Sequence, residues 1–209
     1  MNDRLGVIAQ RAYSSLETLK ASYDIARLAI INGIPGDFVE CGVAAGAQCA
    51  AMALAIMEKE GWVDAYTGKQ RFIDDVRRVH LFDSFTGIPQ AGPEDTEYLE
   101  AGHKAGLTAC SLEAVKRHMA EWGIPDELLV YHPGMFHVTV PTAPQQAIAV
   151  LRLDGDLYES TKVCVEHLFP LVSKGGWVIV DDWDLTGARK AVIDHIGHKF
   201  GPIYFQGIK

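Results

Sequence analysis

The chain has 209 residues, with 27 Asp and Glu against 19 Lys and Arg, so its formal net charge is −8. This acidic balance argues against nucleic-acid and anionic-membrane partners, which repel a negatively charged surface. Hydrophobic residues make up 48% of the sequence, as in folded globular domains. No apolar stretch is long enough for a membrane span, no leader-like segment opens the chain, and the four cysteines form no C-x-x-C pair. We therefore expect residues 1–209 to form one cytoplasmic domain.

Apolar side chains recur at intervals of three and four between residues 5 and 32, which predicts an amphipathic helix or a pair of helices. The positions are Leu16, Leu19, Tyr23, Ala26 and Ile30. We expect residues 1–33 to form an N-terminal helical segment that covers a sheet. A dimer contact or a flap over a site is the alternative.

A short strand at residues 38–41 leads through a glycine-containing turn into an alanine-rich helix at residues 47–59. Gly42 and Gly46 lie in this turn, where glycine lets the backbone approach a ligand closely. Glu40 at the strand tip would repel a pyrophosphate. It suits a ligand with positive charge, such as S-adenosylmethionine, which carries a sulfonium and an ammonium group. Packing of the helix against the strand explains the two glycines equally well.

A second buried strand at residues 78–83 ends in Asp83, after a polar connection at residues 62–75. A carboxylate at the tip of the neighbouring strand is placed to accept the ribose hydroxyls of an adenosyl group. The alternative role for Asp83 is to cap the turn that follows it.

Residues 89–109 show little apolar periodicity, and we expect them to form a mobile lid over an acceptor. A helix at residues 111–122 and a third strand at residues 128–131 follow. The loop after this strand contains Phe136, which either stacks on adenine or joins the core.

Two later apolar strands each end in a pair of carboxylates: Asp154 with Asp156, and Asp181 with Asp182. The strands are separated by a predicted crossover helix at residues 158–172 and a turn at residues 173–176. Parallel strands place their carboxyl ends along one edge of a sheet, so the four acids should converge. Their mutual repulsion favours a bound cation such as Mg²⁺, and Arg152 is expected to pair with one of them.

A last helix at residues 188–199 and an antiparallel edge strand at residues 203–205 complete the predicted elements. Alternating strands and helices predict an α/β fold with a mostly parallel, doubly wound sheet. This arrangement is a Rossmann-like fold.

Four segments of the chain resemble the macrocin O-methyltransferase (TylF-type) family. They are Asp-Phe-Val-Glu-Cys-Gly-Val at 37–43, Leu-Phe-Asp-Ser-Phe-x-Gly-Ile-Pro at 81–89, Leu-Arg-Leu-Asp-Gly-Asp-Leu-Tyr-Glu-Ser-Thr at 151–161 and Gly-Gly-x-Val-Ile-Val-Asp-Asp at 175–182. The resemblance implies the Rossmann-like fold of class I methyltransferases and an enzyme that uses S-adenosylmethionine and Mg²⁺ to methylate a hydroxyl of a sugar or related natural product. The implied partner is a small hydroxylated acceptor, and the implied assembly is a homodimer.

The resemblance also implies roles for individual residues, carried over by position. Its metal ligands match Asp154, Asp181 and Asp182, its general base matches Asp156, its methionine-end contacts match Glu40, Gly42 and Gly46, and its ribose contacts match Asp83 and Ser84.

Two questions stay open in the sequence. His132 and His137 compete with Asp156 as the base, because both follow the third strand. A metal-dependent hydrolase and a non-catalytic adenosyl-binding protein are the other functions that this set of acids permits.

Overall fold

The computed structural model describes residues 2–59, 77–143 and 147–197, without the side chains of residues 2 and 3. In this part of the chain, five strands form one sheet in the order β3-β2-β1-β4-β5, and all neighbouring strands are parallel. The strands are β1 (Asp37–Cys41), β2 (Val79–Asp83), β3 (Leu129–Pro133), β4 (Ile148–Leu153) and β5 (Val172–Val180). The predicted α/β, doubly wound, Rossmann-like fold is therefore confirmed. The predicted strand at residues 203–205 and the connection at residues 62–75 lie outside the described residues.

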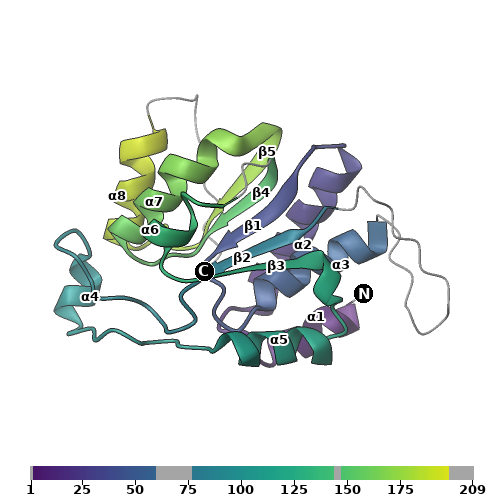
Figure 1. Cartoon of the computed structure of the whole chain (residues 1–209), viewed down its shortest axis with the longest axis horizontal. Helices are drawn as coiled ribbons and strands as arrows, with labels where there is room; N and C mark the ends of the chain where they lie inside the picture. Colours follow the sequence, from purple (N-terminus) through teal and green to yellow (C-terminus); the bar gives the residue numbers. More distant parts are fainter. Residues whose placement is uncertain (1, 60–76, 144–146, 198–209) are drawn as a thin grey trace.

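Helices cover both faces of the sheet, as Figure 1 shows. One face carries α1 (Asn2–Ala9), α2 (Leu16–Ile31), α3 (Ala47–Lys59) and α5 (Leu112–Glu121). The other face carries α6 (Phe136–Thr139), α7 (Tyr158–Leu168) and α8 (Thr186–Ile196). Among the described helices, none has the length and apolarity that crossing a bilayer requires.

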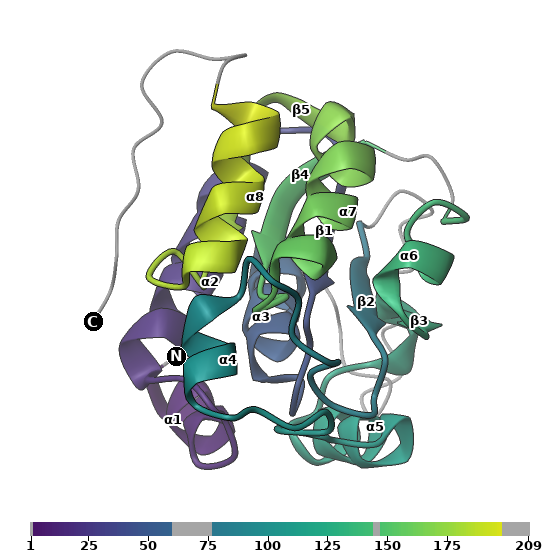
Figure 2. The same cartoon turned by 90° about the vertical axis from the view of Figure 1, so that its left-hand side faces the viewer.

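Helix boundaries differ from the sequence prediction at three places. α7 ends at Leu168 because Pro170 has no N–H to continue the helix, and a 3-10 turn (Phe169–Leu171) follows. α8 already begins at Thr186. The segment 89–109 contains a short helix, α4 (Thr96–Glu100), which lies beside the start of α8 (Figure 2).

The predicted turn at residues 173–176 is instead a bulged part of β5. The register shifts there, since Val172 pairs with Ile148 but Trp177 already pairs with Val150. Glycine permits this bulge: Gly175 has a φ of +83°.

Helix α3 lies in the middle of one layer and is buried on all sides over residues 47–56. It packs between α2 on one side and β1 and β2 on the other. Ala50 and Ala53 have no exposed surface. Small side chains therefore let α3 approach both neighbours closely.

The tips of three strands are tied together by Arg152 of β4, whose side chain is fully buried. Its guanidinium forms ion pairs with Glu40 of β1, at 2.9 Å, and with Asp154 and Asp181, which follow β4 and β5. The pairing that the sequence predicts for Arg152 is thus confirmed. One positive charge thus faces three carboxylates. Burial raises the pKa of Glu40 to about 8, although the charge of Arg152 opposes this shift.

We expect Ala50→Leu to lower the free energy of unfolding by about 1–3 kcal/mol, because the larger side chain has no space around α3. Ala120→Leu on the exposed surface of α5 is the matched control, with a change within about 0.5 kcal/mol. Urea denaturation measures both variants. Equal midpoints for the two would contradict the tight packing of α3.

We expect Arg152→Met to lower the free energy of unfolding by about 3–5 kcal/mol, because three buried or half-buried carboxylates lose their counter-charge. The pKa values of Glu40 and Asp154 in the folded state, which burial already raises, then rise further above those of the unfolded state. Folding therefore takes up protons, and the loss of stability should be smaller near pH 5.5 than near pH 8.

Denaturant titrations at both pH values check this prediction. Arg11→Met, which breaks an exposed ion pair with Glu121, is the control and should cost about 1 kcal/mol or less. A loss for Arg152→Met that does not change with pH would contradict the electrostatic explanation.

Candidate functional site

In the turn after β1, the backbone at Gly42 lies directly against the backbone at Asp154, which follows β4. Gly42 has a φ of +96°, and a Cβ on it would lie 1.6 Å from the carbonyl oxygen of Asp154. The Asp154 N–H donates to the Cys41 carbonyl at 2.8 Å. Only glycine fits this close approach of the two backbones. Gly42 also borders a cavity at this edge of the sheet.

Gly46 meets a different requirement. A Cβ on it would lie 2.7 Å from Cε of Met119 on α5, and its φ is +91°. Gly46 is not among the residues that line the cavity. Close packing of α3 against α5 is therefore what its position requires.

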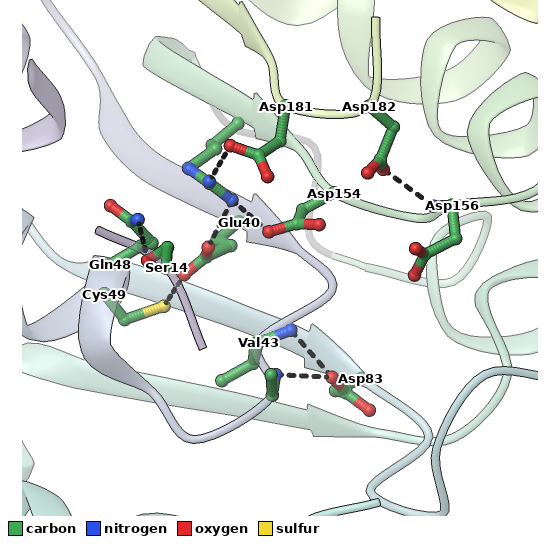
Figure 3. Close-up of polar contacts among 12 residues, drawn as sticks. Ser14, Glu40, Val43, Gln48, Cys49, Asp83, Asp154, Asp156, Asp181 and Asp182 are labelled. Atoms are coloured by element: carbon green, nitrogen blue, oxygen red, sulfur yellow. Dashed lines mark hydrogen bonds and ion pairs between the residues drawn. The ribbon is translucent and has the colours of Figure 1, made fainter. Parts of the chain in front are cut away.

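Asp83 at the tip of β2 holds the glycine turn in place. Its Oδ2 accepts the N–H groups of Val43, at 2.7 Å, and Ala44, at 3.1 Å (Figure 3). Its Oδ1 accepts the N–H of Phe85 at 2.7 Å. Ala44 has a φ of +45°, a conformation that these bonds stabilise. The neighbouring Ser84 donates to the Gly87 carbonyl at 3.2 Å, and both Asp83 and Ser84 border the cavity.

Three carboxylates from two loops gather at the same edge. Asp154, Asp156 and Asp182 each offer an oxygen within 4.8 Å of the others. Asp182 Oδ2 accepts the N–H of Asp156 at 2.8 Å, and Asp156 has a φ of +59°, in the left-handed region (Figure 3). Asp181 lies beside this group, and its Oδ1 accepts from Arg152.

The carboxylates repel one another. Burial, followed by the charges of Asp154 and Asp156, raises the pKa of Asp182 to about 9. Burial raises the pKa of Asp154 to about 6, against the attraction of Arg152. Ionisation of all these carboxylates therefore needs more positive charge than Arg152 supplies, which makes the edge receptive to a cation.

A cavity of about 740 Å³ opens over these strand tips. Its lining, among the described residues, contains many acids and no Lys or Arg. The acids are Glu40, Asp83, Asp95, Asp154, Asp156, Glu159, Asp181 and Asp182. Such a lining disfavours a phosphorylated ligand and favours a positively charged one.

Of the aromatic and histidine candidates, Phe136 and His137 border the cavity. His132 does not line it, and its Nε2 lies 3.0 Å from Nδ1 of His80. Its ring stacks on Phe82, with centroids 4.0 Å apart, and burial lowers its pKa to about 4. The structure thus separates the two histidines that the sequence leaves as alternative bases.

Sequence reasoning missed several polar residues that border the cavity, among them Ser14, Gln48 and Tyr98. Gln48 Nε2 donates to Ser14 Oγ at 2.7 Å, while Gln48 Oε1 is buried and has no hydrogen-bond partner in the described part of the chain. Tyr98 of α4 donates to Asp156 Oδ1 at 2.5 Å. Of these residues, only Gln48 could have been identified from the sequence, because it is the single polar residue in the otherwise apolar stretch 47–56.

Comparison with known proteins gives three related enzymes. The 8-demethyl-8-(2,3-dimethoxy-α-L-rhamnosyl)-tetracenomycin-C 4'-O-methyltransferase of Streptomyces olivaceus is 38% identical over 172 residues, which cover 80% of this chain and 60% of that protein. The demethyldecarbamoylnovobiocin O-methyltransferase of Streptomyces niveus is 37% identical over 81% of this chain and 61% of its own length. The mycinamicin III 3''-O-methyltransferase of Micromonospora griseorubida is 34% identical, covering 80% and 63%. The chain thus spans about three fifths of the length of these curated relatives.

Solved structures agree with the fold. The O-methyltransferase NovP superimposes with a TM-score of 0.72 at 34% identity, covering 88% of this chain and 72% of NovP. The calicheamicin methyltransferase CalS11 gives a TM-score of 0.69 at 23% identity, covering 98% and 86%, and supports the fold alone. A family model for macrocin-O-methyltransferase (TylF) matches residues 14–199. Since this match takes in every described strand and the cavity's carboxylates, the resemblance found in the sequence is confirmed and the chain belongs to the macrocin O-methyltransferase (TylF) family.

Proposed function

We propose that the protein is an S-adenosylmethionine- and Mg²⁺-dependent O-methyltransferase that acts on a hydroxyl of a sugar or related natural product. One observation carries the proposal: the Asp154, Asp156 and Asp182 cluster borders the same cavity as the Gly42 turn and Asp83. A cation-binding centre and a phosphate-free nucleoside site then lie next to each other, as metal-assisted methyl transfer from a sulfonium to a hydroxyl requires.

The residues present fit S-adenosylmethionine. Gly42 borders the cavity without a side chain, and the buried Gln48 Oε1 lacks, among the described residues, the donor that a ligand ammonium group would supply. In this proposal Glu40, Gly42 and Gln48 hold the methionine end, and Gly46 acts indirectly, by shaping the turn.

The adenosyl end is assigned to Asp83, Ser84 and Phe136. Asp83 already accepts three backbone N–H groups, but a carboxylate has about four acceptor sites, so it retains capacity for a ribose hydroxyl. Phe136 offers a ring at the rim of the cavity for adenine.

The residues also fit Mg²⁺, because every donor in the cluster is a carboxylate oxygen, the ligand type that hard cations prefer. We assign Asp154, Asp181 and Asp182 as ligands, with Asp181 contributing Oδ2, since its Oδ1 accepts from Arg152. Asp156 is then the remaining carboxylate of the group, beside the ligands and available for another role.

That role is general base. When bound, S-adenosylmethionine supplies an electrophilic methyl group and Mg²⁺ lowers the pKa of the acceptor hydroxyl. Asp156 would accept the hydroxyl proton as the oxygen bonds to the methyl carbon and the C–S bond breaks, with S-adenosylhomocysteine as the leaving group, a contribution of about 10² to 10⁴ in rate. The cavity walls contribute by holding the two reactants aligned. His137 is the alternative base because it borders the cavity.

The acceptor class follows the names of the relatives, which are O-methyltransferases of a rhamnosyl tetracenomycin, a novobiocin precursor and mycinamicin III. In the proposal, residues 89–109 form a lid over the acceptor and residues 1–33 a helical cover. A cytoplasmic location and a homodimeric assembly stay predictions from the sequence.

We expect isothermal titration calorimetry to detect S-adenosylmethionine binding, and S-adenosylhomocysteine release with demethyldecarbamoylnovobiocin or mycinamicin III to depend on Mg²⁺. Asp156→Asn should lower kcat by about 10² or more while the Kd for S-adenosylmethionine changes less than about threefold. Asp194→Asn, on the exposed surface of α8, is the matched control and should retain the parent rate.

The outcomes separate the three candidate functions. Absence of S-adenosylmethionine binding would reject the methyltransferase and leave the hydrolase. Binding without product release from any acceptor, with or without Mg²⁺, would support a non-catalytic adenosyl-binding protein. An Asp156→Asn variant with the parent kcat would remove Asp156 as the base and favour His137.

A further inference from the structure

Tyr98 is the one residue of α4 that reaches into the carboxylate cluster. Its hydroxyl donates to Asp156 Oδ1 at 2.5 Å, and its side chain borders the cavity. The two residues belong to different segments, α4 and the loop between β4 and α7. Contact between them therefore requires the segment 89–109 to lie against the edge of the sheet.

Two carboxylates of this segment dock it onto the beginnings of the helices α7 and α8. Asp95 is almost completely buried, and its Oδ1 accepts the N–H of Tyr158 at 2.7 Å. Glu97 accepts the N–H of Thr186 at 3.1 Å. Both acceptors meet backbone N–H groups that lack partners inside their own helices, so the docking satisfies these groups.

Gly187 makes this docking sterically possible. A Cβ on Gly187 would lie 1.9 Å from Asp95 Oδ1, so any side chain there would displace the Asp95 carboxylate. The first turn of α8 and the segment 89–109 are thus shaped to fit each other.

The position of the Tyr98 ring is fixed by its contact with His103. The ring meets His103 edge-on, with centroids 4.8 Å apart, and a His103 ring nitrogen lies 3.1 Å from the Pro89 carbonyl oxygen. The two ends of the segment are joined by two backbone hydrogen bonds between Ile88 and residues 106 and 107, each 2.9 Å long. Tyr98 therefore belongs to a loop whose conformation is held by these contacts.

Asp156 needs such a partner. Its backbone is in the left-handed region, with a φ of +59°, and its N–H is held by Asp182 Oδ2. These contacts fix the main chain but leave the carboxylate free to rotate. The Tyr98 hydroxyl is the described group that binds one oxygen of this carboxylate and so sets its orientation.

We propose that Tyr98 is the positioning residue of the catalytic base: the docked segment holds Asp156 Oδ1 through the Tyr98 hydroxyl and leaves Oδ2 to accept the proton of the acceptor. This inference rests on the proposed function, because it presumes that Asp156 is the base. Its consequence is that the base is complete only while the lid is docked, so proton transfer is coupled to closure over the acceptor.

Tyr98→Phe tests the proposal because it keeps the ring that packs on His103 and removes only the hydroxyl. Loss of a hydrogen bond to a charged group should lower kcat about 10- to 100-fold, while KM for S-adenosylmethionine changes less than about twofold. Tyr23→Phe is the matched control, since Tyr23 also donates to a carboxylate, that of Glu58, but does not border the cavity. It should retain the parent kcat.

The double variant Tyr98→Phe/Asp156→Asn separates this inference from the proposed function. If Tyr98 acts through Asp156, the double variant is no slower than Asp156→Asn alone. A parent-like Asp156→Asn overturns the assignment of the base. An inactive Asp156→Asn together with a parent-like Tyr98→Phe overturns the positioning role and leaves the proposed function intact.

Amide hydrogen exchange gives a readout that needs no acceptor. Tyr98→Phe should leave exchange unchanged in residues 89–109, because Asp95 and Glu97 still dock the segment, and in residues 154–158, because Asp182 still holds the Asp156 main chain. Faster exchange throughout residues 89–109 would show that the Tyr98 hydroxyl serves the packing of the lid and would overturn the proposal.

Discussion

A single buried guanidinium organises the functional edge of the sheet. Arg152 contacts an acid on β1, one after β4 and one after β5, so three strand tips share one counter-charge. Taking such a group out of water is costly, and it is tolerated only because the carboxylates surround it closely. The same arrangement leaves the edge short of positive charge, since Asp156 and Asp182 lie beside the three acids that Arg152 pairs with. The constraint that holds the strand tips together therefore also makes the edge receptive to a cationic ligand.

The fold was predictable because its signals are local. Apolar runs that end abruptly in acids mark β1, β2, β4 and β5, and parallel pairing then brings those acids to one edge without further information. The pairing of Arg152 followed from the same logic, since it was the nearest cation to the predicted cluster. The predicted ends of helices and strands were less accurate where the backbone departs from regular geometry. Examples are the end of α7 near Pro170 and the start of β5 at its glycine bulge.

The finer parts of the site carry no comparable signal. Tyr98 and Asp156 are 58 residues apart, and Gln48 and Ser14 are 34 apart, so neither hydrogen bond leaves a pattern in the sequence. Asp83 illustrates a second difficulty. Its position at a strand tip fits both a ribose contact and a turn cap, and the structure gives it three backbone N–H donors while it still borders the cavity. One carboxylate can serve both purposes, which residue type alone does not reveal.

The site divides into a half built on strand tips and a half built on loops. Strand tips cannot move without disrupting the sheet, so the residues proposed to hold the cofactor and the cation are fixed by the core. The opposite wall comes from residues 89–109 and from Tyr13 and Ser14, which lie in loops and short helices outside the sheet. In the proposed function, exposed residues of this wall can change, and acceptor choice with them, while the strand-tip residues are kept. Tyr98 joins the two halves, because it belongs to the loop wall and bonds to a carboxylate of the fixed edge.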